Sequence, residues 1–125
     1  MNPKSKIVLA VVAGAVLGAA AVQGLHAQVK PKAYIVTESE VLDAAALASY
    51  TTAIGAVQKA AGGRSFGTRG KIVASVGDAP KRVGISEWDS LEKVQAYLNS
   101  AERKKVVEGS KVVKITRQYI VEAGN

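Results

Sequence analysis

The order of strand-like and helix-like segments limits the possible folds of this chain more than any other feature. After residue 32, segments rich in β-branched residues are separated by two segments with apolar residues at spacings of three and four. The resulting order is strand, helix, strand, strand, helix, strand. This order predicts an α+β domain of the ferredoxin-like βαββαβ type, an antiparallel sheet with both helices on one face.

The first half of the domain contains clear start and stop signals. We expect a strand over residues 33–38 and a helix from Ala44, for which Asp43 is the N-cap. Gly62 and Gly63 end this helix, because glycine adopts the left-handed C-terminal conformation without steric cost. The apolar stripe that predicts its buried side consists of Leu47, Tyr50, Ile54, Val57 and Ala61.

The second half is less regular at its beginning. Residues 64–76 alternate loosely and contain two glycines, so we expect a bent or interrupted strand. A turn at 77–80 leads to a partner strand at 81–88, which completes a central hairpin. Ser90 is placed to cap a second helix that runs to the break at 109–110. The buried side of that helix is expected to contain Leu91, Val94, Leu98 and Ala101.

The amino-terminal residues show the three-part pattern of an export signal. Two lysines precede an uninterrupted apolar stretch of 16 residues from Ile7 to Val22. A membrane-spanning helix needs about 20 apolar residues, and this stretch is shorter and rich in alanine and glycine. We therefore expect residues 1–27 to be a signal peptide that directs the protein to the periplasm or the exterior. The alternative is an uncleaved anchor in the inner membrane.

Cleavage is expected between Ala27 and Gln28, and cleavage after Gly24 also fits. Residues 28–32 then form a linker, and residues 33–125 form one domain. The chain has no cysteine, and its single histidine lies within the leader. This composition excludes disulfides, histidine general bases and the usual zinc and haem ligands from the mature domain. We expect no metal and no cofactor.

Alternation along the strands predicts which side chains share a face of the sheet. Tyr34, Val36 and Glu38 share one side of the first strand. In the hairpin strand, Val83, Ile85 and Glu87 share a side opposite Arg82, Gly84, Ser86 and Trp88, and in a last strand at 111–122 the residues Ile115, Arg117, Tyr119 and Val121 share a side. Neither face is purely polar, and the helices cover only one of them. Exposed apolar area of this extent is expected to pack against a partner. Since two-fold dimers are the commonest soluble oligomers, we predict a homodimer.

Short groups of residues recur here in an order and at spacings known from a protein family. They are Tyr34-Ile-Val36, Asp43 with Tyr50, Gly62-Gly-Arg64, Arg69-Gly70, Pro80 with Arg82, Glu87-Trp-Asp-Ser90, and Tyr97-Leu-Asn-Ser100 followed by Glu102. Across the mature domain the chain resembles the bacterial domain-of-unknown-function family 1330, part of the dimeric α+β barrel superfamily. The resemblance implies the ferredoxin-like fold and a back-to-back sheet dimer, and it implies no activity. The chain departs from the family pattern at Leu47, where an aromatic residue is common, and at Ala101-Glu102-Arg103, which replaces Pro-Glu-Tyr.

Glu87 is the first candidate for chemistry. Its place in the strand alternation points its carboxylate toward a buried layer, where a raised pKa would suit a general acid or base. The alternative is an ordinary ion pair with a nearby arginine. Arg64, Arg69 and Arg82 come from the hairpin region and, if close together, would bind a carboxylate or phosphate. Their alternative is solvated charge.

Aromatic residues are candidates for the wall of a ligand pocket. Tyr34 and Trp88 are the two that we single out, and their alternative is a place in the core or the dimer interface. The whole chain has a net charge of +7, with a basic cluster around Arg103-Lys104-Lys105. Export and the lack of a recognised binding fold argue against nucleic acid as a partner. Contact with a membrane is expected only through an uncleaved leader.

These observations favour an exported dimeric domain that binds a small organic molecule in the cleft between two sheets. Fold does not transfer function, so two alternatives stay open. One is a cofactor-independent enzyme of the oxygenase or isomerase type, like some relatives in the superfamily. The other is a non-catalytic envelope module that interacts through the basic surface.

Overall fold

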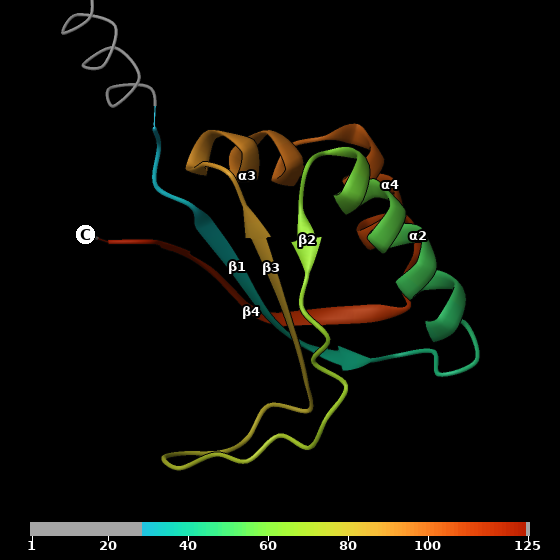
Figure 1. Cartoon of the computed structure of the whole chain (residues 1–125). Coiled ribbons are helices and arrows are strands. Elements are labelled where there is room, and N and C mark those ends of the chain that lie inside the picture. The colour runs from blue at the N-terminus through green and yellow to red at the C-terminus, as the bar shows by residue number, and fades with distance from the viewer. Residues whose placement is uncertain (1–28, 125) are drawn as a thin grey trace, which may run out of the picture. The chain divides into compact units, whose positions relative to one another are not determined.

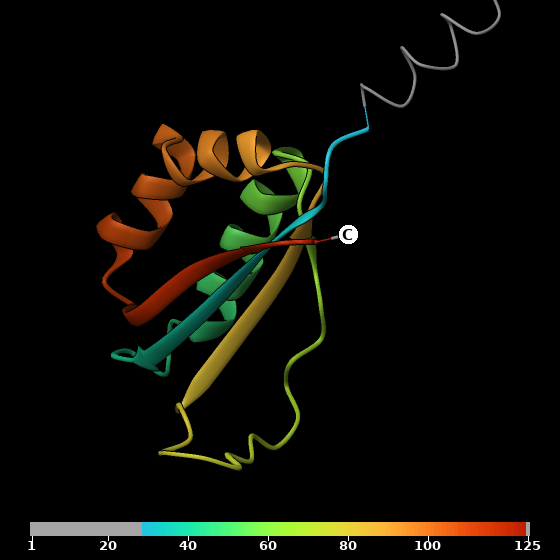
Figure 2. The same cartoon turned by 90° about the vertical axis from the view of Figure 1, so that its left-hand side faces the viewer.

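The structure is a computed structural model that describes residues 29–124. Within them the chain forms one four-stranded antiparallel sheet and three helices. The strand order β2-β3-β1-β4 is that of the ferredoxin-like fold, and Figures 1 and 2 show all three helices on one face of the sheet. The elements are β1 (Ala33–Val41), α2 (Leu47–Ala60), β2 (Arg64–Ser65), β3 (Arg82–Trp88), α3 (Leu91–Leu98), α4 (Ala101–Ser110) and β4 (Val113–Glu122). The predicted α+β class and antiparallel sheet are confirmed.

The predicted leader falls on residues that the structure does not describe. The expected cleavage point between Ala27 and Gln28 lies there too, so export stays a prediction. Within residues 29–124, none of the helices has the length and apolar character needed to cross a membrane.

The first helix begins later than expected. The Asp43 carboxylate accepts a hydrogen bond from the backbone N–H of Ala46 at 3.2 Å, as an N-cap would. The three residues after Asp43 nevertheless form a turn, and α2 starts only at Leu47. The predicted stop is confirmed, because Gly62 has a φ of +100° at the helix exit.

The second helix is divided in two, which the sequence pattern did not predict. The Ser100 hydroxyl accepts a hydrogen bond from the backbone N–H of Arg103 at 3.3 Å and donates one to the carbonyl of Tyr97 at 2.8 Å. A serine that bonds backbone on both sides caps a new helix instead of continuing the old one. The break turns α4 away from α3 (Figure 1) and places Arg103 in the first turn of α4.

The strand expected over 64–76 is reduced to Arg64–Ser65. The backbone N–H of Phe66 still donates to the carbonyl of Ile85 at 2.9 Å, and the Thr68 hydroxyl donates to that of Val83 at 2.6 Å. These two bonds tie the segment to the edge of β3. The following residues form an irregular excursion that extends beyond the end of the sheet (Figure 1).

The pairing of strands assigns the two faces. The face without helices, called the open face below, carries Tyr34, Val36 and Glu38 of β1, Val83, Ile85 and Glu87 of β3, and Arg117, Tyr119 and Val121 of β4. Within each strand these residues share a side, as the alternation predicted. Ile115 is an exception. A bulge between Glu38 and Ser39 pairs Ser39 with Ile115, and this irregularity moves Ile115 to the helix side, which we call the inner face.

The core is divided into two apolar clusters. The first consists of Ala33, Ile35, Trp88, Val94 and Tyr97, and the second consists of Tyr50, Val112 and Val113. Trp88 is fully buried against the Tyr97 ring, with ring centres 4.6 Å apart. Ala101, which was expected on the buried side, is exposed. The helix α3 ends before Ala101, and Tyr97 is the last of its residues to be buried in the core.

Candidate functional site: a cationic cavity between sheet and helices

A cavity of about 580 Å³ lies between the inner face of the sheet and the helices. Its walls come from β1, β3, β4, α2, α4 and the segment at 66–72. A volume of this size is ordinary for a small-molecule site. Both apolar clusters contribute to the wall, the first through Ile35 and Tyr97 and the second through Tyr50. We call this cavity the inner cavity below, and both parts of the divided core border it.

The charge on the wall has one sign. Four cationic residues line the inner cavity, and no aspartate or glutamate does so among the described residues. Lys81 forms an ion pair with Glu40 at 3.7 Å, whereas within residues 29–124 Arg69, Arg82 and Arg103 pair with no carboxylate. Guanidinium groups without a counter-ion in a half-enclosed space attract an anion, and they match carboxylate and phosphate oxygens in pairs.

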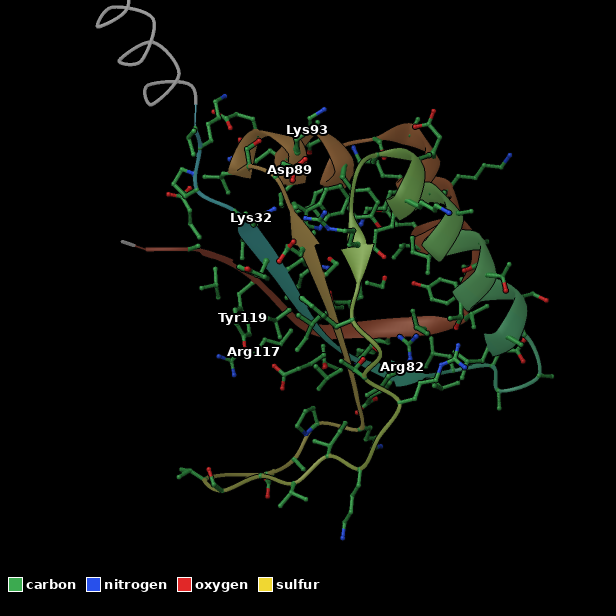
Figure 3. All side chains as sticks on the ribbon, in the orientation of Figure 1. Lys32, Arg82, Asp89, Lys93, Arg117 and Tyr119 are labelled. Atoms are coloured by element: carbon green, nitrogen blue, oxygen red, sulfur yellow. The ribbon has the colours of Figure 1, made fainter. Side chains whose placement is uncertain are left out.

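Two of these arginines are held in place by neighbours. Arg82 begins β3, and its Nη1 donates to the hydroxyl of Ser39 at 3.2 Å. Figure 3 shows Arg82 at the end of the sheet near α2. On the opposite wall, the Arg103 guanidinium lies 5.7 Å from the centre of the Tyr97 ring, and its Nη2 donates to Gln118 at 3.4 Å. Both side chains are half-buried, which orients their remaining N–H groups.

Two tyrosines complete the polar lining. Burial raises the pKa of the Tyr50 hydroxyl above its usual value, and the charges of Arg82 and Arg103 oppose this shift without cancelling it. Burial also raises the pKa of Tyr97, against the opposing effect of Arg103. Both hydroxyls therefore keep their protons at neutral pH. They can donate hydrogen bonds to an anion, but they do not act as bases there.

Glu87 lies on the open face and does not line the inner cavity. Its carboxylate accepts a hydrogen bond from the Tyr34 hydroxyl at 3.1 Å and another from Arg64, and Lys32 lies 3.5 Å away. Partial burial by itself would raise the pKa of Glu87, but these two hydrogen bonds and the charges of Lys32 and Arg64 outweigh it and lower the pKa. The prediction that Glu87 has a raised pKa suited to a general acid or base is therefore wrong, and the alternative, an ion pair with a nearby arginine, is confirmed.

The lowered pKa of Glu87 predicts a specific pH dependence. The ionised carboxylate stabilises the folded state above the ordinary value of 4.5, and this contribution disappears as the pH falls through the lower folded value. We expect Glu87→Gln to lower the denaturation midpoint at neutral pH, and to flatten its decline between roughly pH 5 and pH 3. Urea unfolding at several pH values measures both effects. The control is Glu122→Gln at the exposed end of β4, and equal slopes for Glu87→Gln and the wild type would contradict the assignment.

The structure distributes the candidate residues over three places. Arg69 and Arg82 both line the inner cavity, but Arg64 belongs to the Glu87 cluster, so the three arginines do not form one group. Trp88 lies in the core. Tyr34 lies on the open face, where its ring stacks on Phe66 at 6.4 Å between centres.

Sequence reasoning missed Arg103 as a site residue. It was interpreted only as part of a basic cluster and of a departure from the family pattern. The available signal was the Asn99–Ser100 pair, which is typical of a helix end followed by a new N-cap. A helix that begins at Ala101 places Arg103 in its first turn, over the inner face of the sheet.

Comparison with known proteins agrees with the fold. The sequence matches the family model "Domain of unknown function (DUF1330)" over residues 32–124. The structure is similar to the RPA0582 protein of unknown function from Rhodopseudomonas palustris, with a TM-score of 0.55 and 14% identity over 75% of this chain and 82% of that one. The methylated RPA0582 protein gives 0.56 and 13% over 77% and 82%. No curated protein matches the sequence at a significant level.

Proposed function

Because the chain belongs to the DUF1330 family, whose description assigns no activity, we propose a function from the geometry of the inner cavity. The domain binds a small organic anion that has a carboxylate and an apolar body. One observation carries this proposal. The cavity is lined by four cationic residues, three of them arginines that pair with no carboxylate among the described residues, and by no described aspartate or glutamate.

The wall offers separate partners for the two parts of such a ligand. Arg82 and Arg103 reach the inner cavity from different elements and can each bond a carboxylate in bidentate fashion. The protonated hydroxyls of Tyr50 and Tyr97 add donors. The apolar body would contact isoleucines of the lining, which are Ile35, Ile54, Ile72 and Ile115. We therefore place the ligand between sheet and helices, and not in the sheet-to-sheet cleft expected from the sequence.

The proposal concerns binding, and the lining supports this choice over the enzyme alternative. Among the described lining residues, the titratable groups are three arginines, one lysine and two tyrosines. The pKa of both tyrosines is raised, so neither hydroxyl acts as a base at neutral pH. Glu87, the residue first considered for proton transfer, lies outside the lining and is held as a carboxylate. A carboxylate of lowered pKa is a weak base.

A small panel of paired ligands tests the proposal. Benzoate and octanoate are compared with their neutral counterparts benzamide and octanamide, and with inorganic phosphate, by thermal shift and calorimetry in low salt. A ligand at a hundred times its Kd stabilises the folded state by about 2.7 kcal/mol, which raises the Tm by several degrees. We expect this shift for carboxylates and not for amides. Equal shifts for both, or none, would reject the proposal, and a preference for phosphate would replace the carboxylate.

We also propose that the open face is a homodimer interface. Tyr119, Val121 and Phe66 are 41%, 47% and 49% exposed there, on or beside the two edge strands, which is much apolar area for one face of a sheet. Its ion pairs use charges of both signs in equal number: Lys32, Arg64, Arg117, Glu38, Glu87 and Asp89. A partly apolar face with balanced ion pairs suits a second copy of the same face better than an anionic polymer.

Tyr119 tests this interface. Figure 3 shows Tyr119 and Arg117 on the side of the sheet away from the helices. We expect Tyr119→Glu to raise the dimer dissociation constant about a hundredfold, because it places a charge among the exposed apolar side chains of the open face. Tyr119→Phe keeps the ring that Arg117 covers at 5.0 Å and should stay dimeric. Light scattering after size exclusion measures both variants, and a monomeric wild type at micromolar concentration would contradict the interface.

Export belongs to the proposal on sequence grounds alone. If the leader is removed as predicted, the mature amino terminus determined by mass spectrometry lies close to Gln28. A chain that keeps its leader would instead be an anchored protein, with the same domain outside the inner membrane.

A further inference from the structure

A second hollow continues the inner cavity at the other edge of the sheet. It has a volume of about 530 Å³, and four residues line both hollows: Arg103, Val107, Ile115 and Gln118. The inner cavity reaches the edge of β3, where the segment at 66–72 forms its wall. Because β3 and β4 lie on opposite sides of β1, the two hollows together cross the inner face from edge to edge. We call the second hollow the outer groove.

The outer groove is also cationic. Lys111 lines it together with Arg103, and Glu108 is the one acid among its described lining residues. Lys114 also borders the groove, but it lies in β4 between the inner-facing Val113 and Ile115, so its side chain points to the open face. Lys111 has a φ of 54°, and it is the one non-glycine residue with a left-handed backbone in the described chain. Glycine is the usual choice at such a helix exit. A lysine kept in a disfavoured conformation is in accord with a role for its ammonium group.

The partition between the hollows is weak. Arg103 and Gln118 meet across it at 3.4 Å, near the upper limit for a hydrogen bond. Gln118 is held from the other side by a bond of 2.9 Å to the Thr37 hydroxyl. The other two shared residues, Val107 and Ile115, are apolar. A thin apolar chain can therefore pass the partition at the expense of one long hydrogen bond.

We propose that the ligand is an extended dianion, a linear molecule with a carboxylate at each end. One carboxylate binds at Arg82 in the inner cavity, and the other binds at Lys111 in the outer groove. The connecting methylene groups lie against Val107 and Ile115. This inference rests on the proposed anion binding and assigns the second, outer subsite to it.

Calorimetry on the purified wild-type protein tests the inference with ligands of matched length. Adipate, suberate and sebacate are compared with hexanoate, octanoate and decanoate. We expect one dicarboxylate to bind about tenfold more tightly than the monocarboxylate of equal length, because its second carboxylate gains charge-assisted contacts. Equal affinities within each pair would overturn the inference.

Matched lysine variants separate the outer subsite from general charge. Lys111→Gln should weaken the preferred dicarboxylate about threefold and leave the monocarboxylate unchanged, since this lysine is exposed and its charge is partly screened. Lys104→Gln removes the same charge from α4 outside both hollows and should change neither affinity. If the two variants behave alike, the outer subsite is wrong.

Lys111→Gly distinguishes a ligand role from a structural one. Glycine relieves the left-handed backbone, so the variant should unfold at a higher temperature and still bind the dicarboxylate more weakly. Unchanged dicarboxylate affinity would overturn the role of Lys111. If no mono- or dicarboxylate binds the wild type, the proposed function itself fails. If monocarboxylates bind and dicarboxylates gain nothing, only the extended-ligand inference fails.

Discussion

Replacing Gly63 with alanine is expected to reduce the free energy of unfolding by about 2–3 kcal/mol. A Cβ atom at this position would lie 2.5 Å from Cζ2 of the Trp88 ring, well inside van der Waals contact. The ring cannot retreat easily. It is fully buried, its centre lies 4.6 Å from that of the Tyr97 ring, and its Nε1 donates to the Ser86 hydroxyl at 2.9 Å. Urea unfolding monitored by tryptophan fluorescence measures the loss.

The control for this prediction is Gly109→Ala. Gly109 lies in α4, and an added Cβ there would meet no atom within 4 Å. Alanine is favoured over glycine in a helix by about 0.5–1 kcal/mol, so this variant should be more stable than the wild type. Opposite signs for the same chemical change would assign the effect of Gly63 to its contact with Trp88. A Gly63→Ala variant as stable as the wild type would show that the core is less tightly packed than the structure indicates.

Replacing Arg82 or Arg103 with methionine is expected to weaken carboxylate binding at least tenfold. Each arginine would supply charge-assisted hydrogen bonds worth about 1.5–3 kcal/mol, and every 1.4 kcal/mol is a factor of ten in affinity. Methionine keeps much of the apolar length of arginine, so the cavity wall stays largely intact. The Ser39 hydroxyl loses one donor in Arg82→Met, and its own rotation limits the stability cost. Calorimetry with the tightest ligand of the panel measures the change.

Two further variants make this result specific. Arg117→Met removes the same charge from the open face, where Arg117 lies 3.6 Å from Glu38, and should leave the affinity unchanged. Arg82→Lys keeps the charge and loses the planar fork, so its affinity should lie between those of Arg82→Met and the wild type. Equal weakening by Arg117→Met and Arg82→Met would mean that overall charge attracts the ligand and that the inner cavity does not position it.

Local chemistry predicted most of the fold. The strand alternation placed Tyr34 and Val36 on one side of β1 and Tyr119 and Val121 on one side of β4, because pleated strands alternate regardless of what they pack against. That these two sides form one face is decided by how the strands pair. Ser90 was predicted to cap a helix, and its hydroxyl does accept the N–H of Lys93 at 3.3 Å. Ile115 was assigned to the wrong face because the bulge beside Ser39 depends on how two distant strands pair, which neither strand shows alone.

The candidate site was only partly predictable. Arg69 and Arg82 were expected to share a site and both line the inner cavity. Arg64 was expected with them, but β2 is opposite β3 in a register that pairs Arg64 with Glu87 on the open face. Arg103 reaches the inner cavity only because Ser100 divides the second helix.

The order of the strands, the stop of the first helix at Gly62 and the Ser90 cap follow from the sequence alone, because each depends on residues a few positions apart. The cationic inner cavity and the pKa of Glu87 were decided by the tertiary structure. Both depend on which charges approach one another and how much water remains between them. Lys32, Arg64 and Glu87 lie far apart in the sequence and meet only when β1, β2 and β3 pair. The closeness of these two cations to the Glu87 carboxylate in the folded sheet helps to lower its pKa.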